Sequence, residues 1–193
     1  MNLLVLGPQG AGKGTQAQRI AADFGIPHIS TGDMFRAAID AQTPLGRRVQ
    51  PILASGELVP DALTVELIGD RLSAPDAAEG FILDGFPRNL EQATALDELL
   101  ESLDRRLDAV LFFDLSDDVA MERLLKRASL ENRADDTPEV IQRRLAIYHR
   151  ETKPVIEHYR VKGLLVPLNA AQEIPAVWAE TQSALELLRT APA

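Results

Sequence analysis

The chain has 193 residues but no cysteine, and no apolar run approaches the roughly 20 residues that a membrane-spanning helix needs. Without cysteine, disulfides, thiolate zinc sites and a cysteine nucleophile are excluded. Positive charge is also scarce, because 20 Lys and Arg face 29 Asp and Glu and leave a net charge of −9. A nucleic-acid-binding surface normally carries a basic stripe. We therefore expect no nucleic-acid or membrane partner, and the lack of a basic leader segment predicts a cytoplasmic location.

Apolar residues, by contrast, make up 46% of the chain, which is enough for the core of one domain. Short apolar runs typical of buried parallel strands occur at Asn2–Leu6, Ile26–Ser30, Phe81–Asp84, Ala109–Leu115 and Leu164–Leu168. Helical patterns separate them at Lys13–Phe24, Asn89–Ser102, Asp117–Arg127, Glu139–Tyr159 with a kink or break at Pro154, and Ile174–Leu188. This alternation predicts an α/β fold with a five-stranded parallel sheet covered by helices on both faces.

Two segments interrupt the alternation. Thr31–Ser73 shows only helical patterns between the second and third strands, with prolines and glycines as punctuation. Ser129–Thr137 has the sequence SLENRADDT, which predicts a polar loop between two helices. We expect both segments to form lobes outside the sheet.

A glycine-rich loop with the sequence GPQGAGKGT follows the first strand and precedes the first helix. Glycines at positions 7, 10 and 12 permit backbone turns that side chains would obstruct. Their N–H groups and the helix N-terminus form an anion cradle, in which Lys13 adds a positive charge for phosphates. The usual pattern places Ser or Thr directly after the lysine, whereas this chain has Gly14 and then Thr15. The strand–loop–helix context favours a phosphate-binding loop over a chance run of glycines.

Asp84 ends an apolar strand and is followed by Gly85, Phe86, Pro87 and Arg88. An acid at the carboxyl end of a parallel strand lies in the crevice where such sheets bind ligands. There it could hold Mg²⁺ through water, although a capping or turn aspartate is the alternative. Arg88 can point into the same crevice.

Helical angles sort the remaining arginines. Arg144 falls close to the apolar face formed by Ile141, Leu145 and Tyr148, whereas Arg143 falls on the opposite side and should face solvent. Arg123 and Arg127 are one turn apart and share a stripe. Arg133 lies in the polar loop, where periodicity cannot place it.

The three histidines, His28, His149 and His158, show no metal-ligand spacing, and the chain has no G-x-S-x-G elbow of a serine hydrolase. We interpret all three as structural or surface residues.

Six motifs together resemble the adenylate kinase family: GPQGAGKGTQ, STGDMFR, GELVP, LDGFPR, NRADD and RRLAIYH. They occur in the family's order and span nearly the whole chain. The resemblance implies the three-layer fold of P-loop nucleoside triphosphate hydrolases and an ATP:AMP phosphotransferase that forms two ADP with Mg²⁺. It implies a core at 1–29, 60–125 and 137–193, an AMP-binding lobe at 30–59 and a short lid at 126–136. Relatives with long lids sometimes hold zinc on cysteines, so structural zinc is not expected here, and the family implies a monomer.

The resemblance also assigns site residues. For ATP it implies Gly10, Ala11, Gly12, Lys13, Gly14, Thr15, Arg123, Arg127 and a backbone contact near Gln172. For AMP it implies Thr31, Arg36, Glu57, Leu58, Val59, Gly85, Phe86, Pro87, Arg88, Gln92, Arg133 and Arg144. The residues implied in phosphoryl transfer are Lys13, Arg88, Arg127, Arg133 and Arg144, and Asp84 is the candidate for Mg²⁺.

Three alternatives stay open. A UMP/CMP kinase shares the core, although Thr31 and the amide of Gln92, which matches the adenine edge, favour AMP. A P-loop GTPase switch would carry an N-K-x-D motif, which the chain lacks. An inactive structural relative would not need every arginine named above.

Overall fold

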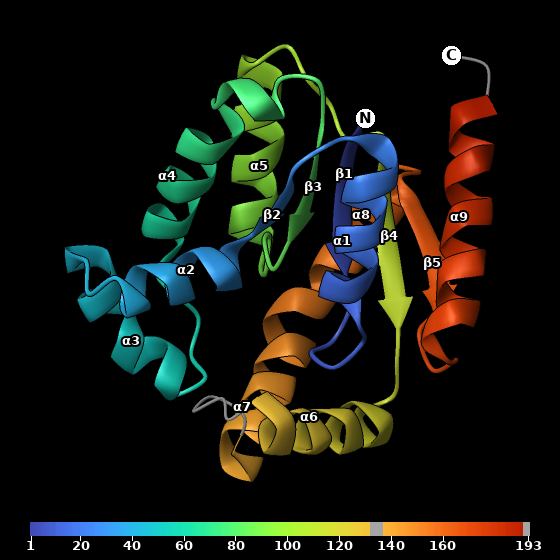
Figure 1. Ribbon diagram of the computed structural model, residues 1–193. Coiled ribbons are helices and arrows are strands. Elements are labelled where there is room, and N and C mark those ends of the chain that lie inside the picture. The colour runs from blue at the N-terminus through green and yellow to red at the C-terminus, as the bar shows by residue number, and fades with distance from the viewer. Residues whose placement is uncertain (132–136, 191–193) are drawn as a thin grey trace.

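The computed structural model describes residues 1–131 and 137–190. Its centre is one parallel five-stranded sheet in the order β2-β3-β1-β4-β5 (Figure 1). The strands are β1 (Asn2–Leu6), β2 (His28–Ser30), β3 (Phe81–Asp84), β4 (Ala109–Asp114) and β5 (Leu165–Asn169). Because β1 pairs with β3 on one side and β4 on the other, the loop that follows β1 leaves the sheet at its centre.

Alternate residues of β1 face opposite sides of the sheet, as the two-residue period of a strand requires. Leu3 and Val5 join a core cluster with α1 (Lys13–Phe24), α6 (Asp117–Glu131), α7 (Pro138–Ile147) and α9 (Ile174–Thr190). Leu4 and Leu6 join a second cluster with α4 (Asp61–Leu72), α5 (Leu90–Ser102) and α8 (Lys153–Val161). The fold therefore has three layers, helix–sheet–helix, as the sequence predicts. A 3₁₀ turn at Pro75–Ala77 precedes β3.

Two helices stand apart from these layers. Figure 1 shows α2 (Thr31–Asp40) and α3 (Pro44–Ala54) projecting from one end of the sheet. Phe35 of α2 and Val49 of α3 form a small third cluster with Val59 of the connection to α4, and Leu63 and Leu67 of α4 pack against it. Gly46 lets them approach closely, because a Cβ there would lie 2.0 Å from the carbonyl oxygen of Ala38. The prediction that 31–73 contains only helices is confirmed, but α4 packs on the sheet rather than outside it.

Three predicted boundaries need correction. The second strand begins at His28 rather than Ile26, and Pro27, which lacks an N–H group, contributes only its carbonyl to the pairing. The polar loop does not begin at Ser129, because α6 continues to Glu131 and the Ser129 hydroxyl donates back to the carbonyl of Lys126. The predicted helix 139–159 is divided by a π-helical turn, Tyr148–Thr152, directly before α8, which has Pro154 in its first turn.

Within the part of the chain that the structure describes, no helix is long and apolar enough to cross a membrane.

Candidate active site

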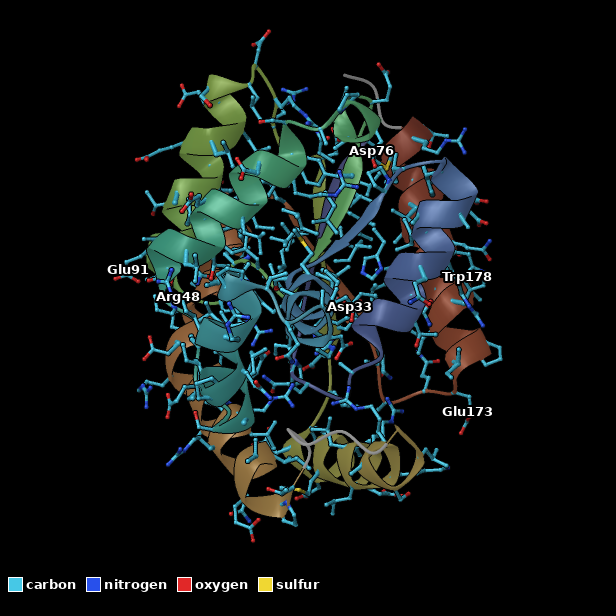
Figure 2. All side chains as sticks on the ribbon, turned by 60° about the vertical axis from the view of Figure 1, so that its left-hand side comes forward. Asp33, Arg48, Asp76, Glu91, Glu173 and Trp178 are labelled. Carbon is cyan, nitrogen blue, oxygen red and sulfur yellow. The ribbon has the colours of Figure 1, made fainter. Side chains whose placement is uncertain are left out.

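A cleft of about 500 Å³ opens at the carboxyl ends of β1, β2 and β3. The strands deliver the glycine loop, Ser30 and Asp84 to it, while α2, α6 and α7 contribute side chains from the sides. Figure 2 shows Asp33, from the first turn of α2, near the middle of the molecule, and Asp33 lines this cleft. Ligands bind to open parallel sheets at this edge.

The glycine loop lines one end of the cleft and leads into α1. Gly7 is in a backbone conformation with φ 143°, and a Cβ there would lie 2.4 Å from the carbonyl oxygen of Phe113 in β4. A larger residue at this position would push the loop away from the sheet. Gly10, Gly12, Lys13, Gly14 and Thr15 all line the cleft, whereas Ala11 is buried beneath the loop. The backbone of the loop and the side chain of Lys13 therefore lie where a ligand in the cleft would meet them.

The ammonium group of Lys13 lies in the cleft, close to the backbone of the glycine loop. It donates to the carbonyls of Gly7 at 2.9 Å and Pro8 at 2.8 Å. Burial, together with the charges of Arg88, Arg144 and Arg127, lowers the pKa of Lys13 from 10.5 to about 8. The charge of Asp84 opposes this shift. A phosphate group in the cleft would oppose it too, because an anion favours the charged ammonium.

Asp84 ends β3 with its carboxylate in the cleft. Burial alone would raise its pKa, but the His28 imidazole and the charge of Lys13 outweigh burial and hold the pKa below its ordinary value. The nearest approach of His28 is 3.5 Å, from Nε2 to Asp84 Oδ2. Gly14 lies beside the same carboxylate, since a Cβ there would be 3.4 Å from Oδ2. The carboxylate is therefore ionised at neutral pH, as a cation site requires.

The turn after β3, Gly85 to Arg88, forms the opposite wall. Gly85 has φ 83°, and its carbonyl accepts hydrogen bonds from Thr31 Oγ1 at 2.9 Å and from Arg88 Nε at 2.7 Å. Thr152, at the end of the π-helical turn, donates its hydroxyl to the carbonyl of Arg88 at 2.7 Å. Phe86, Pro87 and Arg88 line the cleft, whereas Thr31 is buried behind them. These contacts tie the turn to α2 on one side and to the α7–α8 junction on the other.

The arginines divide as the helical angles predict. Arg123, Arg127 and Arg144 line the cleft, as does Arg36, which forms an ion pair with Asp33. Arg123 also donates to the carbonyls of Ala170, Ala171 and Gln172, in the segment between β5 and α9. Arg143 is exposed and lies near Glu57, with 3.6 Å between Arg143 Nη1 and Glu57 Oε1. Arg133 lies outside the described residues.

The remaining predicted site residues do not line the cleft in this structure. Glu57, Leu58 and Val59 form the connection between α3 and α4, and Val59 belongs to the small third cluster. Gln92 is buried in the first turn of α5, 2% exposed. The Gln172 side chain donates to Glu180 Oε2 at 2.6 Å and so faces α9, while its carbonyl accepts from Arg123.

Two polar residues near the site were missed by the sequence interpretation. His28 was treated as structural or surface, yet it lines the cleft beside Asp84. Its position two residues before Ser30 on β2 was the available signal, because alternate strand residues share a face. Asp61 was not singled out, and it holds Gln92 through a hydrogen bond of 2.7 Å. Its partners are distant in sequence, so no local pattern marks it.

Among the described residues no group of three or more His, Asp or Glu side chains is placed to hold a metal ion by itself. The carboxylate of Asp84 lies in the cleft, next to Gly14. Mg²⁺ is commonly held by one or two carboxylates together with waters and substrate phosphates. The donor set of this cleft fits that kind of cation and does not fit an all-protein metal cage.

Comparisons with a family model and with known proteins all match this chain to adenylate kinases. A family model described as adenylate kinase matches residues 5–164. An adenylate kinase of Bifidobacterium longum is 49% identical over 186 residues, covering 96% of this chain and 100% of that protein. An adenylate kinase of Cyanothece sp. is 48% identical over 187 residues, covering 97% and 96%. An adenylate kinase of Archaeoglobus fulgidus is 38% identical over 217 aligned positions, covering 98% and 100%. That alignment is longer than this chain, so the archaeal relative carries residues that this chain lacks.

The family model spans most of the chain, and the bacterial relatives align over almost their whole lengths. Their identity far exceeds what a shared fold alone requires, and the glycine loop and several arginines line one cleft. The chain belongs to the adenylate kinase family.

Proposed function

We propose how this chain performs the adenylate kinase reaction, in which the terminal phosphate of ATP passes reversibly to AMP and two ADP form. The observation that carries the proposal is a concentration of positive charge. Lys13 and five arginines, Arg36, Arg88, Arg123, Arg127 and Arg144, surround one cleft in a protein of net charge −9. Two nucleotides brought together for this reaction carry several negative charges that must be neutralised at close range.

On the ATP side, the glycine loop from Gly10 to Thr15 receives the phosphates, and Lys13 contacts the terminal ones. Arg127 approaches the phosphates from α6. Arg123 lies against the adenine and holds the segment near Gln172, whose backbone contacts the base. The support for this placement is the set of hydrogen bonds from Arg123 to the carbonyls of 170–172.

On the AMP side, the turn of Gly85, Phe86, Pro87 and Arg88 forms the pocket wall. Arg36 and Arg88 bind the AMP phosphate, and Gln92 meets the adenine edge. Thr31 and the backbone of Glu57, Leu58 and Val59 complete the pocket. The support is the hydrogen bond from Thr31 to Gly85, which joins α2 to this turn.

Phosphoryl transfer asks the protein for position and charge rather than covalent chemistry. The nucleophile is a phosphate oxygen, which is already ionised, so no general base is needed. Lys13, Arg88, Arg127, Arg133 and Arg144 therefore act as catalytic residues by holding the two phosphate chains in line. Arg133 enters by resemblance only, because it lies outside the described residues.

Mg²⁺ bound with ATP would neutralise and orient the terminal phosphates. Asp84 is the residue that would hold it, through water, and Gly14 leaves room beside the carboxylate. A structural zinc ion forms no part of the proposal, because the sequence contains no cysteine.

We further propose that residues 30–59 form the AMP-binding lobe and 126–136 a short lid on a core of 1–29, 60–125 and 137–193. Closure of both would keep water from the transferred phosphate, since water would otherwise hydrolyse ATP. The support for movement of the first lobe is that α2 and α3 pack in the small third cluster rather than in either of the two clusters on the sheet. The proposal places the protein in the cytoplasm as a monomer.

A coupled assay with Mg-ATP and a panel of AMP, UMP, CMP, dTMP and GMP tests the acceptor. AMP should give the highest kcat/KM by a wide margin. A pyrimidine monophosphate in first place would instead support the UMP/CMP kinase alternative. The same assay without added divalent cation should lose most of its rate.

A further inference from the structure

Asp61 has no role in the proposed phosphoryl transfer, yet its side chain forms several hydrogen bonds near the site. Asp61 begins α4 and is partly buried, yet its carboxylate does not line the cleft. It accepts a hydrogen bond from Gln92 Nε2 at 2.7 Å. It also accepts from Asn89 Nδ2, at 3.0 Å to one oxygen and 3.1 Å to the other. Both partners belong to the start of α5, so one carboxylate joins the first turns of two helices.

Gln92 is held at both ends of its amide. Its Oε1 accepts from the backbone N–H of Arg88 at 2.8 Å, while its Nε2 donates to Asp61. Its backbone N–H is taken by Asn89 Oδ1 at 2.8 Å, which caps the helix. An ionised carboxylate can only accept and a backbone N–H can only donate. The partners themselves therefore fix which end of the amide carries oxygen and which carries nitrogen.

A rotation of this amide by 180° would be strongly disfavoured. It would set the Gln92 oxygen against the carboxylate of Asp61 and the Gln92 NH₂ group against the N–H of Arg88. Two acceptors would face each other and two donors would face each other, at a site where Gln92 is only 2% exposed. Buried polar groups left without partners are costly.

The groups that remain free on the amide determine what it can recognise. A primary amide has two N–H donors and two carbonyl lone pairs, and Asp61 and Arg88 occupy one of each. One donor and one acceptor remain. A 6-aminopurine offers an acceptor at N1 and a donor at its amino group, whereas a 6-oxopurine offers a donor at N1 and an acceptor at O6. For a base held with N1 opposite Nε2 and the group at position 6 opposite Oε1, the first pattern fits the amide in its observed orientation, and the second fits the rotated one.

We infer that Asp61 is a positioning residue that fixes the Gln92 amide in the orientation for 6-aminopurine monophosphates and thereby rejects 6-oxopurine monophosphates. The inference rests on the proposed placement of AMP against Gln92. Asp61 touches no substrate and acts through Gln92. Its contribution is to selectivity, so it should change the ratio between two acceptors more than the rate with either.

Asp61→Ala tests this with AMP and IMP, which differ in the functional group at position 6 and the protonation of N1. The ratio of kcat/KM for AMP to that for IMP should fall by about tenfold or more, because a freed amide can rotate to accept the oxo base. Asp61→Asn should retain most of the ratio, since its Oδ1 still accepts from Gln92. Glu91→Ala is the matched control: it removes an acid from the first turn of α5, and Figure 2 shows Glu91 at the edge of the molecule pointing outward.

A lower rate with AMP and IMP alike, at an unchanged ratio, would overturn the inference and leave Asp61 a structural link between α4 and α5. That result would not touch the proposed function, which fails only if AMP is not the preferred acceptor of the unaltered enzyme. A second measurement needs no variant. In NMR spectra of the unaltered enzyme, one Gln92 side-chain amide proton should exchange slowly and show a coupling to the Asp61 carboxylate; two rapidly exchanging protons would overturn the inference.

Discussion

Burial in the cleft holds the pKa of Lys13 well below the ordinary value for a lysine. Its pKa of about 8 means that at pH 8.5 most molecules without nucleotide carry a neutral lysine. ATP phosphates favour the charged form, so binding should raise the pKa and take up a proton. We predict that ATP affinity falls as pH rises above about 8, with proton uptake of a sizeable fraction of one per site. Calorimetry at pH 8.5 in two buffers of different ionisation enthalpy measures this uptake.

Lys13→Arg is the control for that experiment, because a guanidinium stays protonated throughout this pH range. Its binding should show little proton uptake at pH 8.5. Equal uptake in the variant and the unaltered enzyme would assign the proton to another group.

Arg143 and Arg144 are adjacent in sequence but differ in what they face. Arg144 lines the cleft, while Arg143 is exposed and close to Glu57. We predict that Arg144→Ala lowers kcat/KM by at least about a hundredfold, since charge that stabilises the transferring phosphate is lost. Arg143→Ala should change it less than about threefold, because an exposed ion pair contributes little. Steady-state kinetics on both variants decides; similar losses in the two would contradict the assignment.

The helical repeat was sufficient to separate these two arginines, because angle along a helix depends only on local sequence. The strand–loop–helix order located the glycine loop for the same reason. Asp61 could not be found in this way, since its hydrogen-bond partners lie 28 and 31 residues further along the chain. The strand period could place His28 on the same face as Ser30, but its pairing with Asp84 could not be found locally, because Asp84 follows only after three intervening helices. Residue-scale features were thus predictable where the determining contacts were local.

At the scale of elements, the π-helical turn between α7 and α8 is joined to the turn that follows β3. Thr152 at the end of the π-helical turn donates to the carbonyl of Arg88 and is 8% exposed. We predict that Thr152→Val lowers the free energy of unfolding by about 1 kcal/mol, because the carbonyl of Arg88 loses its donor while volume is preserved. Thr152→Ser keeps the hydroxyl and should restore part of the loss. Denaturant titration of both variants measures it, and equal stability of Val and the parent would refute the role.

The sequence predicted most elements but not this turn. Apolar runs marked every strand, with β1 and β3 at their observed bounds, because buried strands leave a local signature. Pro154 signalled a break in the helix, yet the π turn begins six residues earlier at Tyr148. The continuation of α6 to Glu131 was also missed, since polar residues were interpreted as a loop although several of them tolerate a helix.

At the scale of the whole molecule, the three core clusters differ greatly in size. Two large clusters cover the faces of the sheet, whereas α2 and α3 contribute one buried residue each to a small cluster that Val59 completes. Few buried contacts make local opening easier. We predict that amides of α2 and α3 exchange with solvent much faster than those of β1, β3 and β4, and that AMP slows the exchange of α2 and α3. Hydrogen exchange followed by mass spectrometry, with and without nucleotide, checks this; equal protection of both regions in each state would contradict a mobile lobe.

The order of the strands in the sheet also determines when each strand can pair during translation. β1 is made first, but it lies in the middle of the sheet and its first partner is Phe81 to Asp84. At roughly 5–20 residues per second, the nascent strand waits several seconds for that neighbour. The glycine loop waits longer, because the surface beneath Gly10 is formed by Ala120 and Leu124 of α6. A ribosome-bound chain that ends before α6 contains the phosphate-binding sequence but lacks the support that shapes it into a binding loop.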